Sequence, residues 1–145
     1  MSERSDKAVA AFQEGFSCSQ AVLSAFCEEL GMGRATGLKV SSAFGGGIAS
    51  TGNLCGAVSG GLMAIGLKHG RTRADDLAAK EKTYALANAF IDEFRARHGS
   101  IVCRELLGCD LGTAEGKAEF KAKNHHGTTC TMLVRDAAEL LEKVM

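Results

Sequence analysis

The sequence predicts an all-α protein, a single-domain bundle of about six to eight helices with a glycine-rich loop before a buried central helix. Three observations support this. The 145-residue chain contains no proline, apolar residues recur at helical spacing, and β-branched residues never form an alternating run. Because no low-complexity linker or internal repeat divides the chain, we expect one domain over residues 1–145.

The first part of the chain predicts two helices and a shorter third. The first helix is expected over about residues 4–14, before a glycine that ends it. Ser17 and Gln20 have the spacing of a capping box and predict a second helix that closes at Gly31. A short helix is expected over about residues 36–44.

The segment Val40 to Leu67 carries no charged residue and is long enough to cross a bilayer. Glycines 45, 46, 47 and 52 divide it into a polar loop and a short apolar helix, which we expect to start at Asn53 and end at Gly70. This length is typical of a buried core helix, so no membrane span is predicted.

Four further helices are expected in the second half. Thr72 and Asp75 resemble a capping box that opens the longest helix, to about His98. Shorter helices follow over about residues 100–107 and 113–123, and the last begins at Thr128 or Thr129. The residues expected to face inward are Leu77, Tyr84, Ala87, Ile91 and Phe94 in the longest helix, and Met132, Leu133, Ala137, Leu140 and Leu141 in the last.

Four of the six cysteines fall in the first turn of a predicted helix, each just after a Ser, Thr or Asn suited to capping it. They are Cys18, Cys55, Cys103 and Cys130. A helix start offers free N–H groups and a partial positive charge, which stabilise a thiolate and lower the pKa of the thiol. Since thiolates are nucleophiles and metal ligands, these four are the candidate catalytic residues.

The other two cysteines are interpreted differently. Cys27 lies nine positions after Cys18, on the opposite side of the same predicted helix, and is expected to be structural. Cys109 lies six residues after Cys103. It could act as a resolving thiol if the turn folds back, and the alternative is a spare thiol in a turn.

The intervals between the four cysteines are 37, 48 and 27 residues, and no CxxC or zinc-finger spacing occurs. Any shared site must therefore be assembled by tertiary packing. Gly56 and Gly60 expose nearly bare backbone on one side of the buried helix, so close packing could bring other helix ends near Cys55. A tightly packed core helix without chemistry is the alternative.

Composition excludes some functions. Lysine plus arginine and aspartate plus glutamate each number 17, which argues against a nucleic-acid partner. The polar amino terminus lacks the apolar stretch of a signal peptide, so we expect a reducing cytoplasmic location.

Two histidines, His125 and His126, lie close to Cys130 in the sequence. His126 precedes Cys130 by four positions, a spacing that could serve a metal. We favour an exposed loop pair for His125 and His126, with Gly127 breaking any helix between them and Cys130.

The cysteines and their flanking glycines occur in a specific order. The motifs are Phe16-Ser-Cys18-Ser-Gln-Ala-Val22, Phe44-Gly-Gly-Gly47, Cys55-Gly-Ala-Val-Ser-Gly-Gly61, Gly66-Leu-Lys-His-Gly70, Cys103-Arg-Glu-Leu-Leu-Gly108 and the late Cys130. Together they resemble the C_GCAxxG_C_C family of redox-active proteins. The resemblance implies a small helical protein whose four family cysteines are those at helix starts, without indicating a substrate.

We therefore predict a thiol-based redox or sulfur-handling protein, in which Cys55 or Cys18 attacks a disulfide, persulfide or sulfane-sulfur donor and a second family cysteine resolves the product. Two alternatives stay open: Cys18, Cys55, Cys103 and Cys130 hold an iron–sulfur cluster or a soft metal ion, or the chain is a non-catalytic helical interaction module. Expected partners are a small thiol or sulfur species or a redox partner protein, and a homodimer is compatible with the glycine-lined helix.

Overall fold

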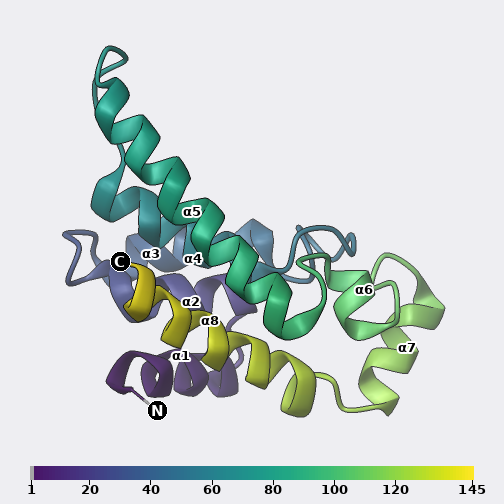
Figure 1. Ribbon diagram of the computed structural model, residues 1–145. Coiled ribbons are helices and arrows are strands. Elements are labelled where there is room, and N and C mark those ends of the chain that lie inside the picture. Colours follow the sequence, from purple (N-terminus) through teal and green to yellow (C-terminus); the bar gives the residue numbers. More distant parts are fainter. Residues whose placement is uncertain (1) are drawn as a thin grey trace.

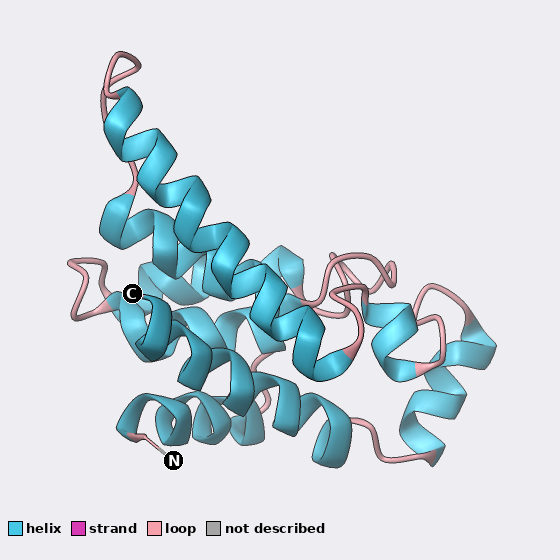
Figure 2. Ribbon diagram, in the orientation of Figure 1, coloured by secondary structure: helices cyan, strands magenta, loops and turns pink. Residues whose placement is uncertain are grey.

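The computed structural model describes residues 2–145 and is built of helices (Figure 2). It contains α1 (Glu3–Glu14), α2 (Cys18–Cys27), α3 (Arg34–Val40), a 3-10 turn η1 (Ser42–Phe44), α4 (Gly56–His69), α5 (Leu77–His98), α6 (Cys103–Leu107), α7 (Ala114–Ala122), a π-helical turn η2 (His126–Cys130) and α8 (Thr131–Val144). Among these residues the β-structure amounts to an isolated bridge between Leu54 and Val102. The predicted all-α fold is confirmed.

Helices α2 and α4 form the centre of the bundle. α2 packs against α1, α3, α4 and α8, while α4 also packs against α5 and α8 (Figure 1). Large side chains from these helices are fully buried between them, including Leu23, Ile65, Phe90 and Leu140. The apolar helix after the glycine-rich loop is therefore the buried central helix that the sequence predicts.

The start of α2 is as predicted and its end is earlier. The N–H of Ser17 donates to Gln20 Oε1 at 3.0 Å, and the N–H of Gln20 donates to Ser17 Oγ at 3.4 Å, which completes the capping box. The helix ends at Cys27, and the chain reaches Gly31, whose φ is +88°, through a turn.

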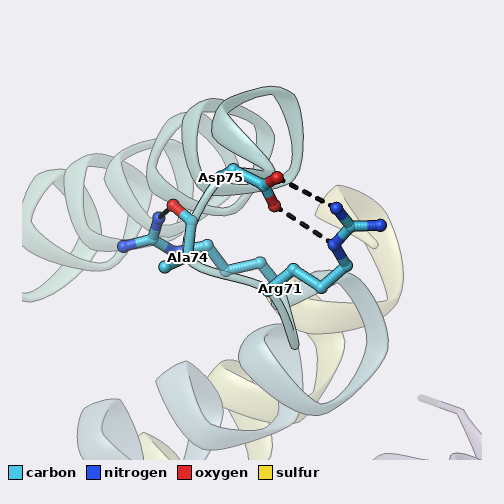
Figure 3. Close-up of polar contacts among 4 residues, drawn as sticks. Arg71, Ala74 and Asp75 are labelled. Carbon is cyan, nitrogen blue, oxygen red and sulfur yellow. Dashed lines mark hydrogen bonds and ion pairs between the residues drawn. The ribbon is translucent and has the colours of Figure 1, made fainter.

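The start of α5 differs from the prediction. Its N-cap is Asp76, whose carboxylate accepts from the N–H of Ala79 at 3.1 Å. The carboxylate of Asp75 instead accepts two hydrogen bonds from Arg73 of the same turn (Figure 3). Arg71 donates a hydrogen bond to the carbonyl of Ala74. The predicted capping box of Thr72 and Asp75 is wrong: α5 begins after Asp76, and the Asp75 carboxylate is bound by Arg73.

The first half of α5 also lies outside the core. Figure 1 shows the α4–α5 turn projecting beyond the rest of the bundle. Leu77 and Tyr84, which were expected to be buried, are 60% and 62% exposed. The buried residues of α5 are Phe90 and Phe94, nearer its carboxyl end, and the helix packs against α4 and α8.

The last helix starts later than predicted. α8 begins at Thr131 after the π-helical turn, and Thr128 turns its hydroxyl back to the carbonyl of Asn124 at 2.9 Å rather than capping the helix. Met132 was expected to face inward and is 47% exposed. The buried stripe is Leu133, Ala137, Leu140 and Leu141, as predicted.

None of the helices in residues 2–145 combines the length and the apolar character that crossing a membrane requires.

Candidate functional site

The four helix-start cysteines line one cavity of about 360 Å³. Cys18 is the first residue of α2 and Cys103 the first of α6, while Cys55 and Cys130 directly precede α4 and α8. The cavity lies where these helix starts meet the ends of α1 and α7 and the glycine-rich loop. Tertiary packing thus gathers cysteines that are far apart in the sequence.

Close contact between α2 and α4 fixes the positions of Cys18 and Cys55. A Cβ atom added to Gly56 would lie 2.9 Å from the backbone nitrogen of Ser19 and 3.0 Å from Cys18 Cβ. At Gly60 it would lie 2.6 Å from the Ser19 carbonyl oxygen. Since real Cβ atoms do not approach so closely, both positions require glycine for this packing.

The isolated β-bridge brings Cys55 and Cys103 to the same wall of the cavity. Their backbone N–H groups each donate to a carbonyl of the opposite segment, at 2.8 and 2.6 Å. Successive side chains of extended backbone alternate between two sides, so the neighbours of Leu54 and Val102 share a side. Accordingly Cys55 and Cys103 line the cavity, whereas Leu54 and Val102 do not.

Three of the four expected side-chain caps are absent. Only Ser17 caps the helix that its cysteine opens; the N-cap residues of α4, α6 and α8 make no side-chain cap hydrogen bond. Asn53 donates instead to Thr51 Oγ1 at 2.8 Å, and Ser100 accepts from the N–H of Val102 at 2.9 Å. These side chains therefore bond within their loops, and to Arg104 and Glu105 of α6, instead of capping a helix.

The glycine-rich loop contains a left-handed turn beside Cys103. Five consecutive residues, 46–50, have φ between +48° and +73°, including the branched Ile48 at +71°. Such conformations cost about 1–3 kcal/mol for a residue other than glycine. Gly47 must be glycine for a second reason, because a Cβ there would lie 2.6 Å from Cys103 Cβ.

The π-helical turn places Cys130 and a histidine at the cavity. The N–H of Cys130 donates to the carbonyl of His125 at 2.8 Å. His126 is exposed, lines the cavity and stacks on Phe12, with ring centroids 4.1 Å apart and an interplanar angle of 17°. His125 is half-buried and faces Thr129 Oγ1 at 3.1 Å, so the two histidines are not an equivalent exposed pair. Gly127 lies within this turn rather than breaking it.

Cys18 and Cys130 form a directly interacting pair of thiols. The thiol of Cys18 donates a hydrogen bond to the sulfur of Cys130, which lowers the pKa of Cys130. The same hydrogen bond, together with burial, raises the pKa of Cys18 well above its ordinary value. The pair therefore loses its first proton readily and holds the second tightly.

Burial is the main influence on the thiols of the other pair, Cys55 and Cys103. It raises the pKa of Cys55 to about 11, although the backbone N–H groups of Ala57 and Val58 act to lower it. It raises the pKa of Cys103 to about 12, with the charge of Cys55 contributing next. The expected lowering of the thiol pKa at helix starts is thus wrong for Cys18, Cys55 and Cys103, because hydrogen bonding or desolvation outweighs the helix terminus.

Cys27 and Cys109 are buried but do not line the cavity. A Cβ atom added to Gly37 would lie 2.8 Å from Cys27 Sγ. Cys27 therefore packs closely against α3, which agrees with a structural role. Burial raises the pKa of Cys109, and the charge of Glu119 adds to this effect. A resolving role for Cys109 stays a prediction.

Among residues 2–145, no three or more His, Cys, Asp or Glu side chains group closely enough to hold a metal ion. All six cysteines in this range are free thiols.

Sequence reasoning missed the apolar wall of the cavity. Phe16, Leu106, Leu111 and Phe120 come from four separate segments and all line it. Their one sequence signal is an apolar residue near a predicted helix end, which also fits ordinary core packing. Only the packing of these ends against one another distinguishes a cavity from a core.

A family described as "Putative redox-active protein (C_GCAxxG_C_C)" matches residues 16–144 of the chain. The chain belongs to the C_GCAxxG_C_C family. All four helix-start cysteines of this C_GCAxxG_C_C protein lie within the match, and all four line one cavity. No curated protein and no solved structure matched the chain.

Proposed function

We propose that this C_GCAxxG_C_C protein exchanges two electrons between a Cys18–Cys130 dithiol and a disulfide substrate. The observation that carries the proposal is that Cys18 and Cys130 line one cavity, where the interaction between their thiols lowers the pKa of Cys130. It supplies both parts of dithiol chemistry: a thiolate of lowered pKa and an adjacent thiol that can resolve the product. Attack is assigned to Cys130, in place of Cys55 or Cys18 as the sequence suggested.

In the first step the Cys130 thiolate attacks one sulfur of a substrate disulfide, R–S–S–R. A bond forms between Cys130 and that sulfur, the substrate S–S bond breaks, and R–S⁻ leaves with its electron pair. A persulfide donor, R–S–SH, reacts in the same way when Cys130 attacks its outer sulfur and R–S⁻ departs.

In the second step the Cys18 thiol transfers its proton to the R–S⁻ released in the first step. The resulting Cys18 thiolate attacks the sulfur of Cys130. The Cys18–Cys130 disulfide forms as the second R–S⁻ leaves. The substrate is reduced to two thiols and the protein is oxidised by two electrons. A small thiol or a dithiol partner protein returns these electrons by the reverse exchange.

Peptide mapping tests this assignment. Cleavage after Lys and Arg leaves Cys18 and Cys27 in one fragment, residues 8–34, whereas the other four cysteines fall in separate fragments. We would therefore use a Cys27→Ser background, since Cys27 lies outside the cavity. The reduced protein would receive one equivalent of dithiodipyridine without air, followed by acid quenching and mass spectrometry.

The expected product is a crosslink between the fragments that contain Cys18 and Cys130. Cys18→Ser should stop the reaction at a mixed disulfide on Cys130, and Cys130→Ser should prevent the crosslink. A Cys55–Cys103 crosslink as the main product, or a Cys18→Ser variant that accumulates no adduct on Cys130, would refute the assignment.

A further inference from the structure

The cavity around the cysteines has mostly apolar walls. Its large side chains are mainly those of phenylalanine and leucine, including Phe12, Phe16, Leu106, Leu111, Phe120 and Leu133. Its volume of about 360 Å³ is near the lower end of the range of about 300–1,000 Å³ for small-molecule sites. A small ligand would therefore contact apolar carbon on several sides.

The walls offer no counterion for a charged ligand. No Asp, Glu, Lys or Arg occurs among the described residues that line the cavity. Both polar atoms of the Gln20 side chain already have partners: Oε1 accepts from the Ser17 N–H at 3.0 Å, and Nε2 donates to the Leu38 carbonyl at 3.0 Å. An ionised group that entered would lose water without meeting a side chain of full opposite charge, which is unfavourable.

Aromatic rings form one part of the wall beside the reactive pair. His126 lies four residues before Cys130, and its ring stacks on Phe12, which is buried. Phe16 and Phe120 are half-buried and line the same cavity. Flat apolar groups can pack against such surfaces by offset stacking.

We infer that the substrate is a small, uncharged organic disulfide whose sulfur atoms carry aromatic or alkyl groups. The inference rests on the proposed function of Cys18 and Cys130. Cys130 attacks the substrate within the apolar cavity, both organic thiols leave after Cys18 resolves the intermediate, and a small thiol or dithiol protein later reduces the Cys18–Cys130 bond. Disulfides of carboxylate-bearing peptides are poor substrates because their charges would have to be desolvated.

Two chromogenic aromatic disulfides of different charge test this inference. Dithiodipyridine is uncharged at neutral pH, whereas dithiobisnitrobenzoate is a dianion. The rate with each would be divided by its rate with the same protein unfolded in urea, which removes the intrinsic reactivity of the probe. We expect the normalised rate to favour the uncharged probe by at least about tenfold, since tenfold corresponds to only about 1.4 kcal/mol.

Matched lysine variants show whether the cavity causes the preference. Leu106 is half-buried and lines the cavity, so Leu106→Lys should reduce the preference at least about fivefold by supplying a cation. His126→Lys is a second variant at an exposed lining residue, should Leu106→Lys not fold. Leu77→Lys adds the same charge at an exposed site on α5 outside the cavity and should leave the preference unchanged.

The outcomes separate the two proposals. If both probes give the Cys18–Cys130 bond at equal normalised rates, the inference on the substrate is overturned and the proposed function stands. An equal response of Leu106→Lys, His126→Lys and Leu77→Lys also overturns it, because net charge would then explain the change. If neither probe yields the Cys18–Cys130 bond, the proposed function fails and the inference fails with it.

Discussion

The two sides of the cavity carry the same residue type at the same kind of position, yet their thiols differ in acidity. On one side, Cys130 accepts a hydrogen bond from Cys18, and its pKa is lowered. On the other side, burial raises the pKa of Cys55 to about 11 and that of Cys103 to about 12. A helix start alone therefore does not produce a thiolate, whereas a neighbouring donor can.

The two sides also differ in how the backbone holds them. Cys18 and Cys130 stand at the starts of α2 and α8, which both pack on α1. Cys55 and Cys103 are fixed by a β-bridge and by a left-handed glycine turn in contact with Cys103. We expect the first pair to react and the second to act mainly as a rigid, protonated wall.

The largest expected effect concerns the contact that joins the two sides. Gly60→Ala would force a Cβ to 2.6 Å from the Ser19 carbonyl oxygen, which should destabilise the protein by about 1–3 kcal/mol. Gly66→Ala, in the same helix, meets no atom within 4 Å and should stabilise the protein by about 0.5–1 kcal/mol. Urea unfolding would measure both, and a loss of stability at Gly66 as large as that at Gly60 would contradict the packing argument.

The next effect compares the reactivity of the two sides. Cys130, whose pKa is lowered, should be more ionised at pH 7 than Cys103, whose pKa burial raises to about 12. Cys130→Ser should therefore slow the first reaction with dithiodipyridine by about tenfold, or about 1.4 kcal/mol. Cys103→Ser should change the rate less than about threefold. Stopped-flow absorbance measures both rates, and similar losses in the two variants would remove the distinction between the sides.

The buried side should also weaken the fold at alkaline pH. The folded-state pKa of Cys55 is about 11, above its ordinary value of 9.0, so the unfolded chain loses this proton first. Its contribution to stability is complete below about pH 9 and is lost as the pH rises through about 11. Between these values the free energy of unfolding should fall by up to about 1.4 kcal/mol per pH unit more in the wild type than in Cys55→Ala. Parallel curves in urea titrations at each pH would show that Cys55 does not retain its proton.

The smallest expected effect concerns the cap that holds Cys18. Ser17→Ala removes the capping box of α2, and Thr113→Ala removes the side-chain cap of α7; each should cost about 1 kcal/mol in the free energy of unfolding. Only Ser17→Ala should also slow formation of the Cys18–Cys130 disulfide, because only α2 carries one of these cysteines. A matching delay in Thr113→Ala would mean that general loss of stability causes the effect.

Local signals predicted much of the fold. The capping box at Ser17 and the glycine that ends the first helix, Gly15, act within a few residues, so their effect is visible in the sequence. The predictions failed where distant or competing partners intervened. Arg73 binds the carboxylate of Asp75, which was expected to cap α5. Leu77 of α5 is exposed, and a π-helical turn precedes α8, which therefore starts later than predicted.

The sequence by itself determined that the protein is helical and that four cysteines stand at helix starts. Helical periodicity and the signals that start and end a helix are local properties of the sequence. It also limited those cysteines to a site made by tertiary packing, since no short spacing joins them. Only the tertiary structure decided that Cys18 meets Cys130, that Cys55 and Cys103 share a buried wall, and that phenylalanines surround them. Hydrogen bonding and desolvation depend on which side chains meet in space, and these effects set the acidity of each thiol.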